Sequence, residues 1–292
     1  MTLPRVTLAW VALSANLYAQ SFTGTVSGTI RDSAGAVVPG ASLTLVNVNT
    51  NEKRTQSSKE DGGYLFALVP PGSYRFEVEH AGFKRFVRSN LAVEVQHTAV
   101  IDVTLEVGAI TESVQVTAET PLLQPTTSSL GQVVDNHKIV EYPLAGRNTF
   151  ALITLTAGAQ PLGEFGNIPA RANAYAAGYF SMNGSQPLTN ETLIDGVPAN
   201  AATTNAPGYI PSVDAIQEFK VQSGNFTAEF GRTGGGVINL VFKSGGNQLR
   251  GSLYEFVRNS AFDANNFFSN RAGRDKAHNA LNQFGGTAGG PV

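Results

Sequence analysis

Short runs of alternating apolar and polar residues dominate the first third of the chain. In residues 74–79 the apolar side chains are Tyr74, Phe76 and Val78, and in residues 101–107 every second residue is apolar up to Val107. Successive side chains of a strand point to opposite faces, so each run predicts a strand with one face inward. Several strands at this spacing predict a small antiparallel β-sandwich over residues 21–107.

Turn-forming residues separate these runs. Such residues tolerate left-handed backbone or have a fixed φ, as chain reversals require. The aspartates among them could also be imagined as calcium ligands, but no acidic cluster with loop spacing surrounds them, so we interpret them as turn residues. The turn sequences are Asp32-Ser33-Ala34-Gly35, Asp61-Gly62-Gly63 and Pro70-Pro71-Gly72-Ser73.

After the predicted sandwich, residues 108–125 form a linker with one extended segment. Polar and β-branched residues alternate in this segment, Pro121 follows it, and no partner for it is obvious within its own domain. Such a strand can add to the sheet edge of another protein, but it could equally be the last strand of the sandwich. The candidate contact residues are Thr111, Glu112, Ser113, Val114, Gln115, Val116, Thr117 and Ala118.

Residues 216–243 read as strand, glycine-rich turn, strand. Gly231, Gly234, Gly235 and Gly236 are expected to adopt the positive φ of a tight turn, and an apolar β-rich run follows them. A phosphate-binding loop would need a Gly-Lys-Ser/Thr sequence leading into a helix, and this chain has none there.

A short helix is predicted at residues 149–155. Asn148 or Thr149 can cap its start, and Leu152, Ile153 and Leu155 are expected on its buried side. The ranges 163–178 and 198–208 are rich in Ala, Asn, Gly and Thr and are predicted to be loops. They could meet a ligand, or they could equally be variable surface without that role.

The N-terminus predicts export. Arg5 precedes an apolar run from Val6 to Leu17, which suits a signal-peptide core but falls short of the ~20 residues of a membrane helix. We therefore expect a signal peptide at residues 1–20 with cleavage near Ala19. A buried N-terminal helix is the alternative.

Composition excludes some partners and chemistries. The 292 residues carry a net charge of −2 and twenty scattered Lys and Arg residues, which argues against nucleic-acid binding. The chain has no cysteine, so disulfides and thiolate sites are impossible. His80, His97, His137 and His278 lack zinc-ligand spacing, and no nucleophile elbow is present. We expect no enzyme, no metal and no cofactor.

The residues of the predicted sandwich resemble the carboxypeptidase regulatory-like domain, whose fold is transthyretin-like or carbohydrate-binding-like. Tyr64, Phe66, Tyr74 and Phe76 are interpreted as core residues and not as a sugar-binding platform. The motifs that carry the resemblance are Asp32 to Gly35, Pro39-Gly40-Ala41, Gly63-Tyr64-Leu65-Phe66, Pro71-Gly72-Ser73-Tyr74 and Gly82-Phe83.

The rest of the chain resembles TonB-dependent outer-membrane receptors of the Oar-like branch. Residues 126–246 resemble the α+β plug, residues 111–118 resemble a TonB box, and residues 247–292 resemble the first strands of a β-barrel. A complete 22-stranded barrel needs on the order of 400 residues, so we expect a fragment or truncated product. The plug motifs are Pro143-Leu144-Ala145-Gly146-Arg147-Asn148, Phe180-Ser181-Met182-Asn183-Gly184, Leu193-Ile194-Asp195-Gly196-Val197-Pro198, Pro211-Ser212-Val213-Asp214-Ala215-Ile216 and the 216–243 segment.

This resemblance implies a function. It implies that the receptor takes up a small ligand, whose identity is unknown, through the outer membrane, with TonB as the energy-coupling partner. The sandwich and the 111–118 segment would lie on the periplasmic side. The alternative is a barrel-less periplasmic or surface module that binds carbohydrate or a partner protein. Apolar residues such as Leu253 and Phe256 in the tail argue against that alternative.

Overall fold

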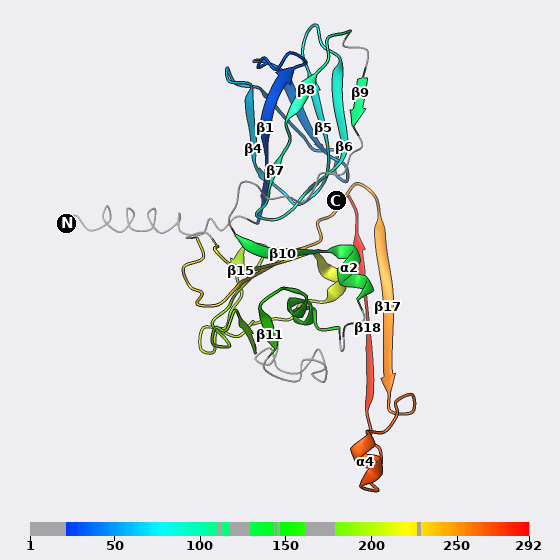
Figure 1. Cartoon of the computed structure of the whole chain (residues 1–292). Helices are drawn as coiled ribbons and strands as arrows, with labels where there is room; N and C mark the ends of the chain where they lie inside the picture. The colour runs from blue at the N-terminus through cyan, green and yellow to red at the C-terminus, as the bar shows by residue number, and fades with distance from the viewer. Residues whose placement is uncertain are drawn as a thin grey trace, which may run out of the picture. The chain divides into compact units, whose positions relative to one another are not determined.

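The computed structural model describes residues 22–109, 113–116, 129–142, 144, 147–161, 179–226 and 229–291. The chain divides into two compact units, Met1–Lys243 and Ser244–Val292. The first unit holds the sandwich, within residues 22–116, and a second region of mixed structure that we call the α+β region, residues 129–243 (Figure 1). The predicted signal peptide at residues 1–20 lies outside the described residues.

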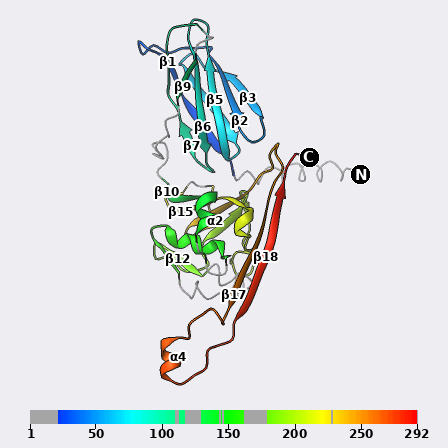
Figure 2. The ribbon, with the colours of Figure 1, turned by 90° about the vertical axis from the view of Figure 1, so that its right-hand side faces the viewer.

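Two sheets form the sandwich. One has the order β4-β1-β7, with β8 also pairing β1, and the other has the order β3-β2-β5-β6-β9 (Figure 2). Most pairs are antiparallel, but β1–β7, β1–β8 and β6–β9 are parallel. Both sheets are therefore mixed, whereas the sequence predicted purely antiparallel sheets. The strands are β1 (Gly24–Asp32), β2 (Ser42–Asn47), β3 (Lys53–Ser57), β4 (Gly63–Val69), β5 (Gly72–Glu79), β6 (Arg85–Val93), β7 (Thr98–Val100), β8 (Val103–Leu105) and β9 (Ser113–Val116).

The alternating apolar residues of the sandwich meet between its sheets. Phe76 is fully buried, and its ring stacks on Tyr64 with centroids 5.3 Å apart, while Phe66 meets it edge-on. The prediction that these aromatic residues form the core is confirmed. Val107 is the exception, because it lies beyond β8 in an isolated bridge and is 71% exposed.

The α+β region is built on a five-stranded sheet of order β10-β15-β16-β13-β14, in which only β13–β16 is parallel. Apolar residues of one sheet face pack with η3, α2 and β12 into a core that includes Phe150, Phe180 and Phe219. The elements are β10 (Leu130–Asp135), α2 (Asn136–Glu141), η3 (Thr149–Leu155), β11 (Ala159–Pro161), β12 (Phe180–Met182), β13 (Glu191–Ile194), β14 (Val197–Pro198), η4 (Val213–Ala215), β15 (Ile216–Gly224) and β16 (Val237–Phe242).

The short helix predicted at residues 149–155 is present as the 3-10 helix η3. Asn148 caps it, and the Asn148 side chain accepts a hydrogen bond of 3.0 Å from the Phe150 backbone N–H. Leu152 and Ile153 are buried as expected, whereas Leu155 at the end of the helix is 38% exposed.

The glycine-rich segment before β16 differs from the prediction. None of Gly231, Gly234, Gly235 and Gly236 has a positive φ, so the expected left-handed turn is wrong. Gly235 and Gly236 are instead required because there is no room for a Cβ atom at either position. A Cβ atom on Gly235 would lie 2.3 Å from Asn190 Oδ1, and one on Gly236 would lie 2.9 Å from the Gln222 carbonyl oxygen. The glycines let neighbouring segments approach closely.

The second unit is a long antiparallel hairpin. β17 (Arg250–Asn259) pairs with β18 (Ala280–Gly289) in unbroken register, and the connection between them contains the short helix α4 (Phe267–Arg271) (Figure 1). Alternation in the sequence is weak here, yet both strands are ten residues long. Leu253 is 93% exposed and Phe284 is 77% exposed, so this unit carries apolar surface.

Among the helices in the described ranges, none is long and apolar enough to cross a bilayer.

Candidate functional site

The predicted TonB-contact segment is described only at its centre. Residues 113–116 form β9, whereas Thr111, Glu112, Thr117 and Ala118 lie outside the described residues. β9 pairs in parallel with β6, with Phe86 opposite Val114 and Val87 opposite Gln115. The segment therefore does have a partner in its own domain at residues 113–116, which extend the sandwich sheet as the alternative of a last sandwich strand predicted.

β9 occupies the end of its sheet. In the order β3-β2-β5-β6-β9, one edge of β9 faces β6, and the described residues provide no strand for the other edge. Val114 is half-buried and shares a row with the core residue Phe86, while Gln115 is exposed. An edge strand presents backbone N–H and C=O groups to which a further strand can pair.

A group of charged residues stabilises the strands beside β9. Glu77 of β5 binds the guanidinium groups of Arg75 and Arg85, and Arg85 also forms an ion pair with Glu79 at 2.9 Å. Burial disfavours the charged form of Glu77, but the hydrogen bonds from Arg85 and Arg75 outweigh it and hold the pKa of this carboxyl below its ordinary value. Glu77, Val87 and Gln115 are opposite one another across three strands.

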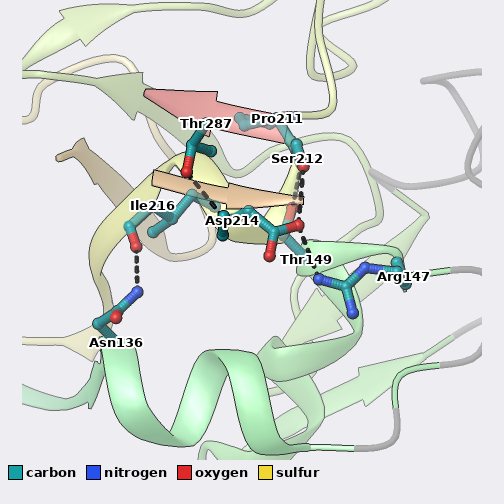
Figure 3. A network of polar contacts seen from close by, with 9 residues as sticks. Asn136, Arg147, Thr149, Pro211, Ser212, Asp214, Ile216 and Thr287 are labelled. Atoms are coloured by element: carbon teal, nitrogen blue, oxygen red, sulfur yellow. Dashed lines mark hydrogen bonds and ion pairs between the residues drawn. The ribbon is translucent and has the colours of Figure 1, made fainter. Parts of the chain in front are cut away.

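Two of the predicted plug motifs meet in an ion pair (Figure 3). Arg147, which follows Gly146 in one motif, donates to Asp214 Oδ2 of the other at 2.8 Å, and each side chain is 12% exposed. Ser212 donates to the same oxygen at 3.4 Å. Arg147 and Asp214 are 67 positions apart in sequence, so their ion pair joins distant segments of the chain.

Further hydrogen bonds in Figure 3 anchor the same segment. The Asn136 side chain at the start of α2 donates to the Ile216 carbonyl at 2.6 Å, and the Thr149 hydroxyl donates to the Pro211 carbonyl at 3.5 Å. These contacts fix the entry into β15, which is the second strand of the sheet. In the described residues of these motifs, the polar side chains therefore hold backbone segments in place.

One predicted ligand loop is described and one is not. Residues 163–178 lie outside the described residues. In the 198–208 loop, the Asn200 amide donates to the carbonyls of Asn190 and Asn205, and the Asn205 amide donates to the Leu188 carbonyl at 2.6 Å. These side chains hold the loop to its own neighbours. A ligand role for either loop stays a prediction.

The part of the chain that the structure describes contains no group of three or more His, Asp or Glu residues able to hold a metal ion. Asp32, which could have been a calcium ligand, accepts the backbone N–H groups of Ala34 and Ala36, as turn aspartates do.

Sequence reasoning missed two charged residues of β15. Glu218 and Lys220 are 6% and 3% exposed. Burial raises the pKa of Glu218 to about 7 and lowers the pKa of Lys220 to about 8. Their partners are backbone groups of Val95 and Gln96 in the sandwich. Alternation along β15 predicts that both residues lie on one face, but nothing local predicts what covers that face.

Comparison with known proteins assigns both ends of the chain. Residues 25–106 match the carboxypeptidase regulatory-like domain, and residues 241–292 match an outer membrane beta barrel domain. The TonB-dependent transporter Oar of Myxococcus xanthus is 27% identical over 305 residues, which cover 98% of this chain. The chain is therefore similar to part of a TonB-dependent transporter. It spans 27% of the length of that relative.

Solved structures overlap this chain only in part. The siderophore receptor PirA from Acinetobacter baumannii is 19% identical, covers 58% of this chain and 23% of its own, and has a TM-score of 0.42. The outer membrane transporter YddB from Escherichia coli is 19% identical, covers 51% and 22%, and has a TM-score of 0.37. The match of residues 241–292 to an outer membrane beta barrel domain supports an outer-membrane location.

Proposed function

We propose that this chain is the plug-bearing part of an outer-membrane receptor that couples uptake of a small ligand to TonB. The homology over 98% of the chain is the observation that carries the proposal. In this proposal the residues are neither an enzyme nor a nucleic-acid-binding protein. The ligand is unspecified, and the sandwich and the 111–118 segment lie on the periplasmic side.

The energy-coupling contact is assigned to residues 111–118. β9, at the centre of this segment, pairs β6 at a sheet edge and precedes β10, the edge strand of the α+β sheet. A strand of TonB can bind to the segment by backbone pairing, either at the outer edge of β9 or in place of β6. A pull on the segment then acts on β10 and, through the β10–β15 pairing, on the plug sheet.

Cysteine crosslinking in cells tests this contact. Because the chain has no cysteine, single substitutions from Thr111→Cys to Ala118→Cys in the full-length receptor can be paired with single cysteines in TonB. Strand pairing predicts crosslinks that are strong at every second position, since alternate side chains share a face. Ser33→Cys, at an exposed turn of the sandwich, is the control. Equal crosslinking at Ser33 and at the segment would contradict the assignment.

A backbone variant separates pairing from side-chain effects. Val114→Pro removes one N–H and should abolish the crosslinks at neighbouring positions, whereas Val114→Thr keeps the N–H and the β-branched shape and should retain them. Ligand uptake should follow the same order once a ligand is known. Full crosslinking in the proline variant would rule out strand pairing here.

Cell fractionation tests the location. An antibody against residues 22–107 should detect a heat-modifiable band in the outer membrane, as closed barrels give. A soluble periplasmic band would favour the barrel-less interaction module instead.

A further inference from the structure

The sheet of the α+β region has a second face that is polar yet buried. Phe219 and Val221 of β15 point to the apolar core, so Glu218, Lys220 and Gln222 point to the opposite face. These three side chains are only 3–6% exposed. Burying charged groups costs free energy unless they find partners, so what covers this face matters.

Glu218 and Lys220 find their partners in the sandwich. Glu218 Oε1 accepts a hydrogen bond of 2.8 Å from the Val95 N–H. Lys220 Nζ donates to the carbonyl oxygens of Val95 and Gln96, at 2.9 and 2.8 Å. An acid and a base two residues apart thus bind both polar groups of one residue, Val95, which is fully buried.

This contact lies between the two strands that hold the ends of the linker. β6 ends two residues before Val95 and pairs with β9, while β15 carries Glu218 and Lys220 and pairs with β10. The linker between β9 and β10 begins within the proposed TonB-contact segment. The covalent linker and these side chains therefore both join the sandwich to the α+β sheet.

We propose that Glu218 and Lys220 form an interdomain clamp that holds the sandwich on β15 through the Val95–Gln96 backbone, independently of the linker. When the linker is drawn out, the clamp keeps the two regions docked, and the load passes to the edge strands β9 and β10. The statement about the load on β9 and β10 rests on the proposed function, whereas the clamp itself does not.

The charged groups around the clamp fit this role. Glu94, next to Val95, favours the protonated form of Lys220, and burial together with Lys220 lowers the pKa of His97. His97 is therefore neutral at neutral pH and adds no positive charge beside Lys220. Glu218 and Lys220 compensate each other, because each stabilises the charged form of the other.

Amide exchange in the 292-residue chain, in detergent micelles, measures the clamp directly. A hydrogen bond to a charged group contributes about 1.5–3 kcal/mol, so Glu218→Gln with Lys220→Met should speed exchange of the Val95 amide roughly ten- to a hundredfold. Lys59→Met with Glu60→Gln makes the same changes at an exposed pair of the sandwich and should leave the Val95 amide unchanged.

A distance measurement tests whether the clamp holds the regions together. Spin labels at Ser33→Cys in the sandwich and Thr203→Cys in the α+β region, both exposed, should give a narrow distance distribution in the parent chain and in the Lys59/Glu60 control. The double clamp variant should broaden it. Unchanged exchange and an unchanged distribution would overturn the proposal.

Two further measurements keep the outcome interpretable. If the double variant does not fold, Lys220→Met alone removes two of the three hydrogen bonds and should still broaden the distance distribution, and a narrow one would overturn the clamp. Crosslinking of residues 111–118 to TonB separates the hypotheses. If the parent chain shows a narrow distance distribution but no crosslinks to TonB, the coupling function is contradicted and the clamp is not. In the double clamp variant we expect a broadened distance distribution with the crosslinks retained.

Discussion

The sandwich and the α+β region are each organised around a five-stranded sheet, yet they use the two faces of that sheet differently. In the sandwich, β5 places Tyr74, Phe76 and Val78 in the core. On its other face Arg75 is exposed and Glu79 is partly exposed, and only Glu77, between its arginine partners, is buried. In the α+β region, β15 buries its apolar face and its polar face alike. An alternating strand therefore does not establish that its polar side is exposed, because another part of the chain can cover it.

The strongest test of this comparison is to remove one large aromatic residue from each core. Phe76→Ala and Phe219→Ala should each lower the free energy of unfolding by about 3–5 kcal/mol, because both side chains are fully buried. Denaturant unfolding with hydrogen exchange measures the loss and locates it. Leu65→Ala, at a half-exposed position, should change stability by only about 0.5 kcal/mol. Equal losses of protection in both regions from either variant would show one core and not two.

A smaller loss is expected from the ion pair of the α+β region. Arg147→Met leaves Asp214 buried without its main partner and should cost about 3 kcal/mol. Adding Asp214→Leu should restore part of that loss, since a buried pair replaced by apolar residues is often neutral. Thermal unfolding of the parent, of each single variant and of the double variant gives the coupling energy. Additive losses would mean that the two side chains do not interact.

The pH dependence of stability sharpens the contrast between the two polar faces. The folded state binds the Glu218 proton more tightly than the unfolded chain does, so the free energy of unfolding should fall as the pH rises from about 4.5 through 7. Lys220 acts oppositely, so stability should rise between about pH 8 and 10.5. His97, whose pKa is lowered, opposes Glu218 below its ordinary value of 6.5.

Difference curves isolate these contributions. The free energy of unfolding is measured against pH for each protein. Subtracting the curve of Glu218→Gln from that of the parent should leave the fall between about pH 4.5 and 7, and Lys220→Met should remove the rise between about pH 8 and 10.5. The exposed Glu60 of the sandwich provides a control, because Glu60→Gln should leave both pH-dependent changes in place. A flat difference curve for Glu218→Gln would mean that this carboxyl is not buried in solution.

Local signals predicted much of the fold. The alternation at Tyr74, Phe76 and Val78 predicted an inward face, and Asn148 predicted a helix start, because both depend on neighbouring residues alone. The parallel pairing of β9 with β6 could not be predicted, since it joins strands whose register depends on the whole sandwich. The glycines before β16 were interpreted wrongly, because a close approach to Asn190 and Gln222 requires glycine as much as a positive φ does.

The candidate site was predicted less completely. The order of motifs indicated a resemblance to TonB-dependent receptors, and the similarity to the TonB-dependent transporter Oar agrees with that resemblance. The contact of Arg147 with Asp214 and that of Lys220 with Val95 span 67 and 125 positions, so no local pattern contains them. Long-range polar contacts of this kind follow from the packing of complete elements.

In the hairpin of the second unit, Tyr254 lies opposite Gly285, and its ring covers the space where a side chain of Gly285 would stand. A Cβ atom at Gly285 would approach the Tyr254 hydroxyl oxygen to 2.5 Å. The two positions therefore share one volume. In related sequences, a larger residue at position 285 is compatible only with a smaller or displaced side chain at position 254. The residues at these two positions should therefore vary together.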